Sequence, residues 1–246
     1  LLKVIDRWTD ILDQGGSVDA VFLDFAKAFD TVPHERLLTK LAGYGVGGMI
    51  LQWIRNFLLG RRQRVVVAGV FSDWLPVISG VPQGSVLGPL LFVTYINDLP
   101  ENIASFLYMY SDDTKMFRRV DGELDRRALQ RDLDQLVEWA DKWQLRFNVD
   151  KCKVMHLGRG ENVGSLYAMR GADGQRLLLK ETENEKDLGV WTSNTLKPIS
   201  HVTHAVNTAN RILGLIRRTF TYLNGEIMKQ LYTSLVRPHL EYGNVV

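Results

Sequence analysis

The sequence is poor in the features that mark secreted and membrane proteins. Among its 246 residues there is a single cysteine, Cys152, so no disulfide can form within the chain and a reducing compartment is the natural setting. No apolar run is long enough to cross a bilayer, and the N-terminal residues do not form a signal peptide. These absences predict an intracellular protein of the nucleus or cytoplasm, not secreted and without a membrane partner.

A strong overall charge is also missing. The formal net charge of +2 neither requires nor excludes a nucleic-acid partner. Basic residues gather at 61–64 and in the stretch 197–246, and each cluster fits a solvated face as well as a phosphate-binding surface. An initiator methionine is absent, and the chain stops directly after apolar and aromatic residues. Both ends therefore look cut, and we expect further protein on each side.

The chain does contain enough apolar residues for a packed core. They make up 46% of the sequence against 24% charged residues, which excludes wholesale disorder. Apolar periodicity predicts helices at 2–14, 33–42, 50–59, 86–99, 123–143, 198–219 and 226–235. It predicts strands at 19–24, 64–70, 74–78, 106–110, 115–119, 153–157, 176–180 and 187–191. Because these elements do not alternate strictly, we expect an α+β fold, an antiparallel sheet with helices packed on one face.

Local signals refine this prediction at three places. Asp30 and Thr31 are cap candidates for the helix at 33–42. A Gly-rich turn is expected at 69–73 and a Gly-rich loop at 158–164. Residues 43–48 (GYGVGG) fit the dinucleotide-binding spacing, but they follow a helix rather than a strand, so we interpret them as a helix end and turn.

Two apolar segments end in acidic residues. Residues 20–24 (AVFLD) end at Asp24, and residues 106–113 (FLYMYSDD) end at Asp112 and Asp113. Carboxylates beside buried strands are unfavourable unless compensated, and two charges about 4 Å apart interact by roughly 4 kcal/mol at an effective dielectric near 20. Three such acids together would take up protons or bind a divalent cation, and oxygen ligands favour Mg²⁺ over zinc. Alternatively, these acids are ordinary turn or cap residues.

A third segment lies between the two acidic ones. Residues 79–89 (SGVPQGSVLGP) carry three glycines and two prolines just before a predicted helix. Glycines let the backbone approach a ligand closely, and a helix N-terminus favours an anion such as phosphate. The alternative is an ordinary loop that enters a helix.

Together these segments resemble the motifs of reverse transcriptases. Residues 21–30 (VFLDFAKAFD) are similar to the first palm motif, 82–84 (PQG) to the second and 110–113 (YSDD) to the third, with Ser111 where alanine is more usual. Residues 148–151 (NVDK) resemble the fourth motif and 187–190 (DLGV) the fifth, the primer grip. Five motifs in this order are far more specific than any one of them. The residues in these motifs are similar to those of retrotransposons without long terminal repeats, in the jockey and chicken-repeat group.

The resemblance implies a right-hand polymerase fold. Residues 1–196 would form the palm with partial fingers, in which 35–80 is an inserted fingers/palm segment, and 197–246 would begin a helical thumb. Upstream fingers and an endonuclease domain are not in this chain. The implied activity is RNA-directed DNA polymerisation, which extends a DNA primer on an RNA template with deoxynucleoside triphosphates. Two Mg²⁺ ions, with Mn²⁺ as a possible substitute, are the implied cofactors.

The same resemblance implies roles for individual residues. The implied catalytic residues and metal ligands are Asp24, Asp112 and Asp113, with the backbone carbonyl of Phe25. The implied binding residues are Phe29, Gln83 and Lys151 for the nucleotide, Leu188 and Gly189 for the primer grip, and Arg211, Arg217 and Arg218 for the nucleic-acid backbone. Phe29 is alternatively a core residue, and Lys151 a surface lysine.

Two other functions compete with this interpretation. One is an inactive nucleic-acid-binding remnant of a decayed retrotransposon. The other is a metal-dependent phosphodiesterase that uses the same acids. His201 and His204 lie three residues apart on a predicted helix, but with one cysteine and no flanking ligands a zinc site is not expected. The sequence does not predict an oligomeric state.

Overall fold

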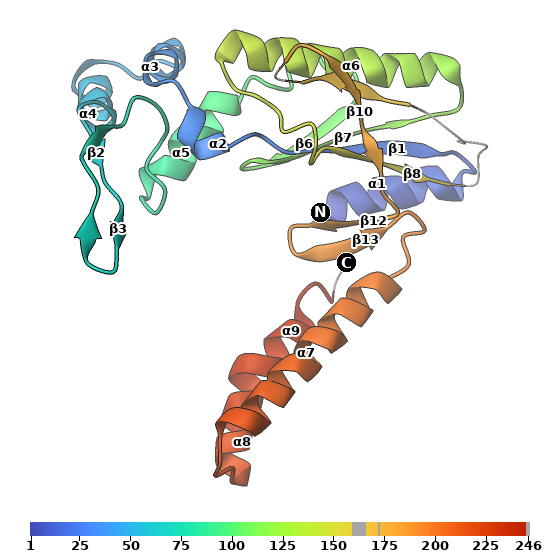
Figure 1. The fold of residues 1–246 in the computed structure, drawn as a ribbon. Coiled ribbons are helices and arrows are strands. Elements are labelled where there is room, and N and C mark those ends of the chain that lie inside the picture. The colour runs from blue at the N-terminus through green and yellow to red at the C-terminus, as the bar shows by residue number, and fades with distance from the viewer. Residues whose placement is uncertain (159–165, 172, 245–246) are drawn as a thin grey trace.

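The computed structural model describes residues 1–158, 166–171 and 173–244. Its centre is a five-stranded sheet in the order β11-β8-β1-β7-β6 (Figure 1). The strands are β1 (Val18–Leu23), β6 (Phe106–Tyr110), β7 (Asp113–Arg119), β8 (Lys153–Leu157) and β11 (Lys180–Glu181). β1 pairs antiparallel with β7 and β8, and β6 pairs antiparallel with β7, whereas β11 runs parallel to β8. The sheet is mainly antiparallel, as predicted.

One face of the sheet packs against α5 (Leu87–Ile96) and α6 (Glu123–Trp143). Alternate side chains of a strand point to opposite faces, so Val21 and Met116 join the same core as Leu133 of α6. The bounds predicted for α6 are confirmed, because its apolar residues recur at helical spacing. The α+β fold is therefore confirmed.

The opposite face carries α1 (Leu2–Asp13), which the prediction of helices on one face did not include. Val4 and Trp8 of this helix pack against Ala20 and Phe117, whose side chains point away from α5 and α6. Two further strands, β12 (Asn184–Asp187) and β13 (Val190–Ser193), form a hairpin on the same side (Figure 1). The second face is thus shared by a helix and a hairpin.

Residues 28–76 extend away from the sheet (Figure 1). This part contains α2 (Ala28–Thr31), α3 (His34–Gly43), α4 (Gly48–Leu58) and the strands β2 (Arg62–Gln63), β3 (Val66–Val67), β4 (Val70–Phe71) and β5 (Leu75–Pro76). The long strands predicted at 64–70 and 74–78, and the turn at 69–73, are wrong. The chain instead turns at Ala68 and Gly69, which both have positive φ, as a two-residue hairpin loop requires.

The cap prediction at this place is also wrong. Asp30 and Thr31 lie inside α2, and the Thr31 hydroxyl donates to the carbonyl of Lys27 at 3.1 Å. Pro33 occupies the N-cap position of α3 without a side-chain cap. The interpretation of 43–48 as a helix end and turn is confirmed, because α3 ends at Gly43 and α4 begins at Gly48.

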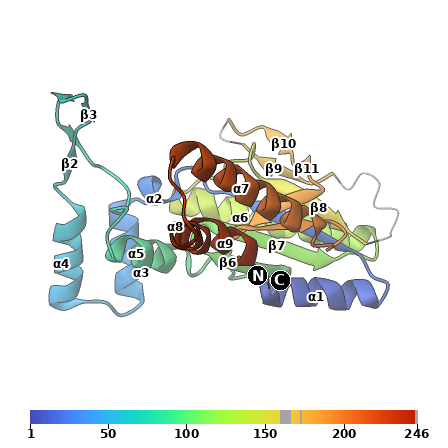
Figure 2. The same ribbon diagram turned by 90° about the horizontal axis from the view of Figure 1, so that it is seen from below.

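The last part of the chain is mainly helical. A small hairpin of β9 (Ala168–Arg170) and β10 (Arg176–Leu178) precedes it. Then α7 (Ile199–Thr219), α8 (Gly225–Leu231), a π-helical segment (Tyr232–Val236) and α9 (Arg237–Glu241) form an arm that leaves the sheet (Figures 1 and 2). No helix in the described ranges is long and apolar enough to span a membrane. Apart from Gly158, the loop predicted at 158–164 lies outside the described residues.

Candidate active site

Strand register brings the two acidic segments together. β1 and β7 pair so that Leu23 lies opposite Thr114, and one further step along the same register leads to Asp24 and Asp113. β6 and β7 form a hairpin in which Tyr110 pairs with Asp113, so Ser111 and Asp112 make its two-residue loop. Asp112 is half-buried in this loop. The segments that the sequence suggested as partners therefore meet at one corner of the sheet.

Asp24 and Asp113 share a pocket on the face opposite α5 and α6, whereas Asp112, in the hairpin loop, does not line it. Phe22 and Asp24 alternate with core residues of β1, and Asp113 and Lys115 alternate with those of β7, so all four point to this face. The pocket measures about 300 Å³ and is open to solvent. Its lining includes Asp24, Asp113, Lys115, Lys151, Glu185 and Asp187.

Negative charge concentrates in this pocket. The Asp113 side chain stays exposed, yet the chain around it removes enough water to raise its pKa, and the like charges of Asp112, Asp187 and Asp24 raise it further. Asp24 has the Lys151 Nζ atom 3.4 Å from its Oδ2 atom. That Oδ2 atom is buried and, within the described residues, accepts no hydrogen bond. The pocket therefore holds carboxylate oxygens that the protein does not fully engage.

The fourth-motif segment lies directly beside the first. The backbone N–H of Asn148 donates to the carbonyl of Asp24 at 2.8 Å, and that of Ala26 donates to Arg146 at 2.8 Å. Neither bond uses the carbonyl oxygen of Phe25, whose ring stacks on Phe147 at 4.5 Å. This pairing explains why Lys151, at the end of the following turn, reaches Asp24.

The second-motif loop docks on α2 rather than in the pocket. The N–H of Val81 donates to the carbonyl of Phe29 at 2.7 Å, and Gly80 has φ 87° with no room for a side chain beside Asp30. The Phe29 ring is half-buried and stacks on Phe92 at 4.7 Å. Gln83 is exposed and does not line the pocket. The roles assigned to Phe29 and Gln83 stay predictions.

The fifth-motif residues form a turn instead of the strand predicted at 187–191. Asp187 ends β12, Val190 begins β13, and Leu188 and Gly189 make the turn with φ of 47° and 86°. Tyr242 donates its hydroxyl to the carbonyl of Leu188 at 2.7 Å. Arg211, Arg217 and Arg218 are exposed on α7 and do not line the pocket.

Comparison with known proteins identifies the family. The family described as "Reverse transcriptase (RNA-dependent DNA polymerase)" matches residues 6–229. The chain belongs to the reverse transcriptase family. It is 29% identical to the RNA-directed DNA polymerase from mobile element jockey of Drosophila funebris and 31% identical to a probable RNA-directed DNA polymerase from transposon X-element of Drosophila melanogaster. Each match covers 99% of this chain, which spans 27% of the length of either relative.

Two solved structures of Candida tropicalis telomerase share the fold. The apo enzyme, truncated from its C-terminal domain, gives a TM-score of 0.51 at 13% identity and covers 80% of this chain and 39% of its own. The complex with a fragment of telomeric RNA gives a TM-score of 0.53 at 11% identity and covers 96% and 40%. At these identities the likeness concerns the fold alone, and it assigns the reverse transcriptase chain a right-hand polymerase architecture.

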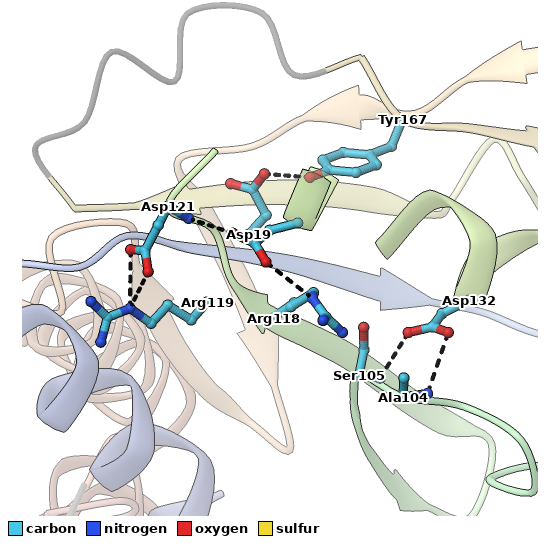
Figure 3. Close-up of polar contacts among 9 residues, drawn as sticks. Asp19, Ala104, Ser105, Arg118, Arg119, Asp121, Asp132 and Tyr167 are labelled. Atoms are coloured by element: carbon cyan, nitrogen blue, oxygen red, sulfur yellow. Dashed lines mark hydrogen bonds and ion pairs between the residues drawn. The ribbon is translucent and has the colours of Figure 1, made fainter. Parts of the chain in front are cut away.

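Other buried acids of this reverse transcriptase domain contrast with Asp24. Asp19 contacts His156 Nδ1 at 2.6 Å. It also accepts a hydrogen bond from the Tyr167 hydroxyl at 2.5 Å, and Asp132 accepts one from the backbone N–H of Ser105 at 2.7 Å (Figure 3). Both lie on the helix-covered side, and both are satisfied by protein donors. They are structural, whereas the Oδ2 atom of Asp24 accepts no hydrogen bond from the described residues and has the Lys151 Nζ atom at 3.4 Å.

The donors in the pocket suit a hard cation. They are carboxylate oxygens, which Mg²⁺ prefers. The pKa of Asp113 is raised first by the loss of water around it and then by like charges, and a cation would relieve that repulsion. In the part of the chain that the structure describes, no three His, Cys, Asp or Glu side chains form a ready-made metal cluster. The residue types therefore fit the divalent metals that the reverse transcriptase family generally uses, although the side chains are not arranged as a closed ligand set.

Sequence reasoning missed one feature of this site. Lys115 and Asp187 are both buried and form an ion pair between β7 and the fifth-motif turn. A second pair joins Lys153 Nζ to Glu185 Oε2 at 2.8 Å. A usable signal was Lys115 itself, because a charge in the middle of a predicted strand requires a partner when it is buried.

Proposed function

We propose that this chain is the catalytic core of an RNA-directed DNA polymerase that extends a DNA primer on an RNA template with deoxynucleoside triphosphates. The observation that carries the proposal is the shared pocket of Asp24 and Asp113, in which the Oδ2 atom of Asp24 lies 3.4 Å from Lys151 Nζ but accepts no hydrogen bond from the described residues. Family membership and the similarity to RNA-directed DNA polymerases of mobile elements support the reaction and the substrates. The division into a palm at 1–196 and the start of a thumb at 197–246 remains part of this proposal.

Asp24, Asp112 and Asp113 would hold two Mg²⁺ ions, together with the carbonyl oxygen of Phe25. When bound, such ions neutralise charge on the attacking and leaving oxygens of the phosphoryl transfer. The chain itself supplies position: strand pairing fixes Asp24, and the hairpin loop aims Asp112. Lys151 adds a positive charge beside Asp24, where it would favour departure of pyrophosphate.

The remaining binding roles belong to residues that do not line the pocket. Phe29 would lie under the sugar of the incoming nucleotide, and Gln83, in the loop docked on its backbone, would contact the nucleotide or template. Leu188 and Gly189 would hold the primer end. The exposed arginines of α7 (Arg211, Arg217 and Arg218) would contact phosphates of the duplex, an interaction that weakens with salt.

Primer extension tests the proposal. The purified chain is incubated with a labelled DNA primer on an RNA template, deoxynucleotides and Mg²⁺, and product length is followed over time. We expect extension that stops on chelation, resumes with Mg²⁺ or Mn²⁺, and is lost in Asp112→Asn. Asp141→Asn is the matched control, because this exposed acid of α6 does not line the pocket and pairs with Arg170 on the surface.

Two results would overturn the proposal: no extension by the unaltered chain, or extension that Asp112→Asn leaves intact. None of the comparisons favours the alternative of an inactive remnant. That alternative predicts salt-dependent binding of primer–template without synthesis, so the same samples distinguish the two functions.

A further inference from the structure

A buried ion pair joins the catalytic strand to the fifth-motif turn. Lys115 lies on β7 two residues after Asp113, and its side chain is 7% exposed. Its partner Asp187 is 4% exposed and directly precedes the turn of Leu188 and Gly189. Both residues line the pocket that holds Asp24 and Asp113. The pair therefore links the strand that carries Asp113 to this turn through two buried side chains.

The turn is also held from its other side. Tyr242, just after α9, donates its hydroxyl to the carbonyl of Leu188 at 2.7 Å. The Tyr242 carbonyl in turn lies 2.8 Å from His201 Nε2 of α7, and His201 Nδ1 accepts from the backbone N–H of Trp191 at 3.4 Å. The turn is thus fixed between the sheet and the helical arm, and the Lys115–Asp187 pair is its contact on the side of the sheet.

Attachment alone does not explain why this contact is ionic. The pair between Lys153 and Glu185 already ties β12 to β8, and the contacts of Tyr242 tie the turn to the arm. A buried ion pair is weak evidence for stability, because apolar residues of similar volume often serve as well. An ion pair fixes the distance and orientation of its two side chains more closely than an apolar contact does, because its energy depends on the positions of the charged atoms.

We propose that Lys115 and Asp187 form a positioning pair that sets the distance between the pocket acids and the turn of Leu188 and Gly189. This inference rests on the proposed function, because it assumes that the turn holds the primer. The pair would then align the 3′-hydroxyl of the primer with the reacting phosphate. A displacement of about 1 Å at a reacting centre lowers the rate by roughly 100-fold, so a short and rigid connection at this place has a direct kinetic consequence.

The decisive variant replaces both charges at once. Lys115→Met with Asp187→Leu removes both charges and leaves two apolar side chains of similar size in the buried site, so the fold is expected to persist. We expect kcat for single-nucleotide addition to fall by roughly 100-fold, while the KM for nucleotide changes little. Primer–template bearing 2-aminopurine at the primer 3′ end provides a readout without catalysis. Its fluorescence response should be lost in the variant, although primer–template still binds with unchanged affinity.

A buried ion pair elsewhere supplies the matched control. Lys40 of α3 and Asp98 are bonded and mostly buried, and neither lines the pocket. Lys40→Met with Asp98→Leu should lower the melting temperature at least as much as the test variant does, because the Tyr95 carbonyl and Trp139 Nε1 also lose a partner, yet keep kcat and the fluorescence response. Should the test variant fail to fold, Asp187→Glu preserves the charge and lengthens the side chain by one methylene. Positioning then predicts a lower kcat with a melting temperature near that of the unaltered chain.

The outcomes separate this inference from the proposed function. Suppose that the unaltered chain extends the primer, and that kcat and the fluorescence response are equally high in the test variant or in Asp187→Glu. This result would overturn the positioning pair but not the proposed polymerase. No extension by the unaltered chain, but a fluorescence response that the test variant loses, would support positioning of the primer and overturn the polymerase. If the unaltered chain gives no extension and no fluorescence response, both the positioning pair and the polymerase are overturned.

Discussion

The central sheet presents an apolar core under α5 and α6, whereas the opposite face, apolar under α1, carries a charged pocket at one corner. Under α5 and α6, Val21 and Met116 join a continuous apolar core with Leu133. On the other face, the same two strands, β1 and β7, place Asp24 and Asp113 in an open pocket, where each carboxylate lies near like charges. Alternation with a period of two allows one strand to serve both faces. The core face can therefore stabilise the fold while the pocket face carries charges that repel.

The core face also contains an acid, Asp19, whose surroundings differ from those of Asp24 in the pocket. Asp19 is fully buried, but Tyr167 and His156 engage its carboxylate. Asp24 is only partly buried, and one of its oxygens has no hydrogen-bond partner in the described part of the chain. Burial alone thus does not identify a functional acid. An unengaged oxygen beside like charges is the more informative sign.

The largest expected effect is on the pocket face. Asp24→Asn keeps the size of the side chain and removes its charge, so we expect the rate of primer extension to fall by at least about 10³-fold. The melting temperature should not fall, because the change also removes one of the charges that raise the pKa of Asp113. Single-turnover extension and thermal unfolding measure the two quantities. Retained activity, or a loss of stability as large as that of a core substitution, would remove the distinction between the faces.

The next effect concerns the core face. Leu133 is completely buried in α6, and Leu133→Ala should lower the free energy of unfolding by about 3 kcal/mol through lost burial and a new cavity. Denaturant unfolding measures this change, and extension well below the melting temperature should stay close to that of the unaltered chain. Leu124→Ala on the same helix is the control, since Leu124 is 81% exposed. Equal destabilisation by both would show that burial on this face is not what holds the sheet.

Much of the core face could be predicted from the sequence, and the reason is local. Apolar residues recur at helical spacing along α6, and its predicted bounds are the observed ones. The β6–β7 hairpin was predictable from two apolar runs around a short polar segment, and the ordered motifs indicated the family. Such signals depend on neighbours in sequence, which a single chain displays directly.

The rest of the pocket face depends on contacts between distant residues. Lys115 and Asp187 are separated by 72 positions, and nothing local links them. Leu188 adopts a positive φ that its residue type disfavours, so the sequence predicted a strand where Tyr242 and the ion pair hold a turn. The Val-rich run at 65–67 likewise suggested a long strand, yet the two-residue turn at Ala68 and Gly69 divides it. Tertiary contacts overrode propensity at each of these places.

A smaller effect is expected from pH on the free energy of unfolding, through the pairing of His156 with Asp19 on the core face. Burial lowers the pKa of His156, but its hydrogen bond and ion pair with Asp19, together with Glu181, outweigh burial and raise the pKa above 6.5. Because the folded-state pKa is the higher one, this stabilisation is complete below pH 6.5 and is lost as the pH rises through the folded-state value. Denaturant unfolding at a series of pH values should show this decline. His156→Gln should flatten it, and an unfolding free energy that rises over the same range would contradict the assignment.

The smallest expected effect is at the tip of the β6–β7 hairpin, where the expected changes in stability and in extension rate oppose each other. Ser111 has φ 58°, a left-handed conformation that costs an L-residue roughly 1 kcal/mol, so Ser111→Gly should stabilise the chain by about that amount or less. A glycine also loosens the loop that aims Asp112, and we expect extension to slow a few-fold. Ala68→Gly is the matched control, because Ala68 has φ 48° in a turn remote from the pocket. It should give a similar gain in unfolding free energy at an unchanged extension rate. If both substitutions leave the rate unchanged, the strained serine serves only the turn, and the pocket face does not require rigidity at this position.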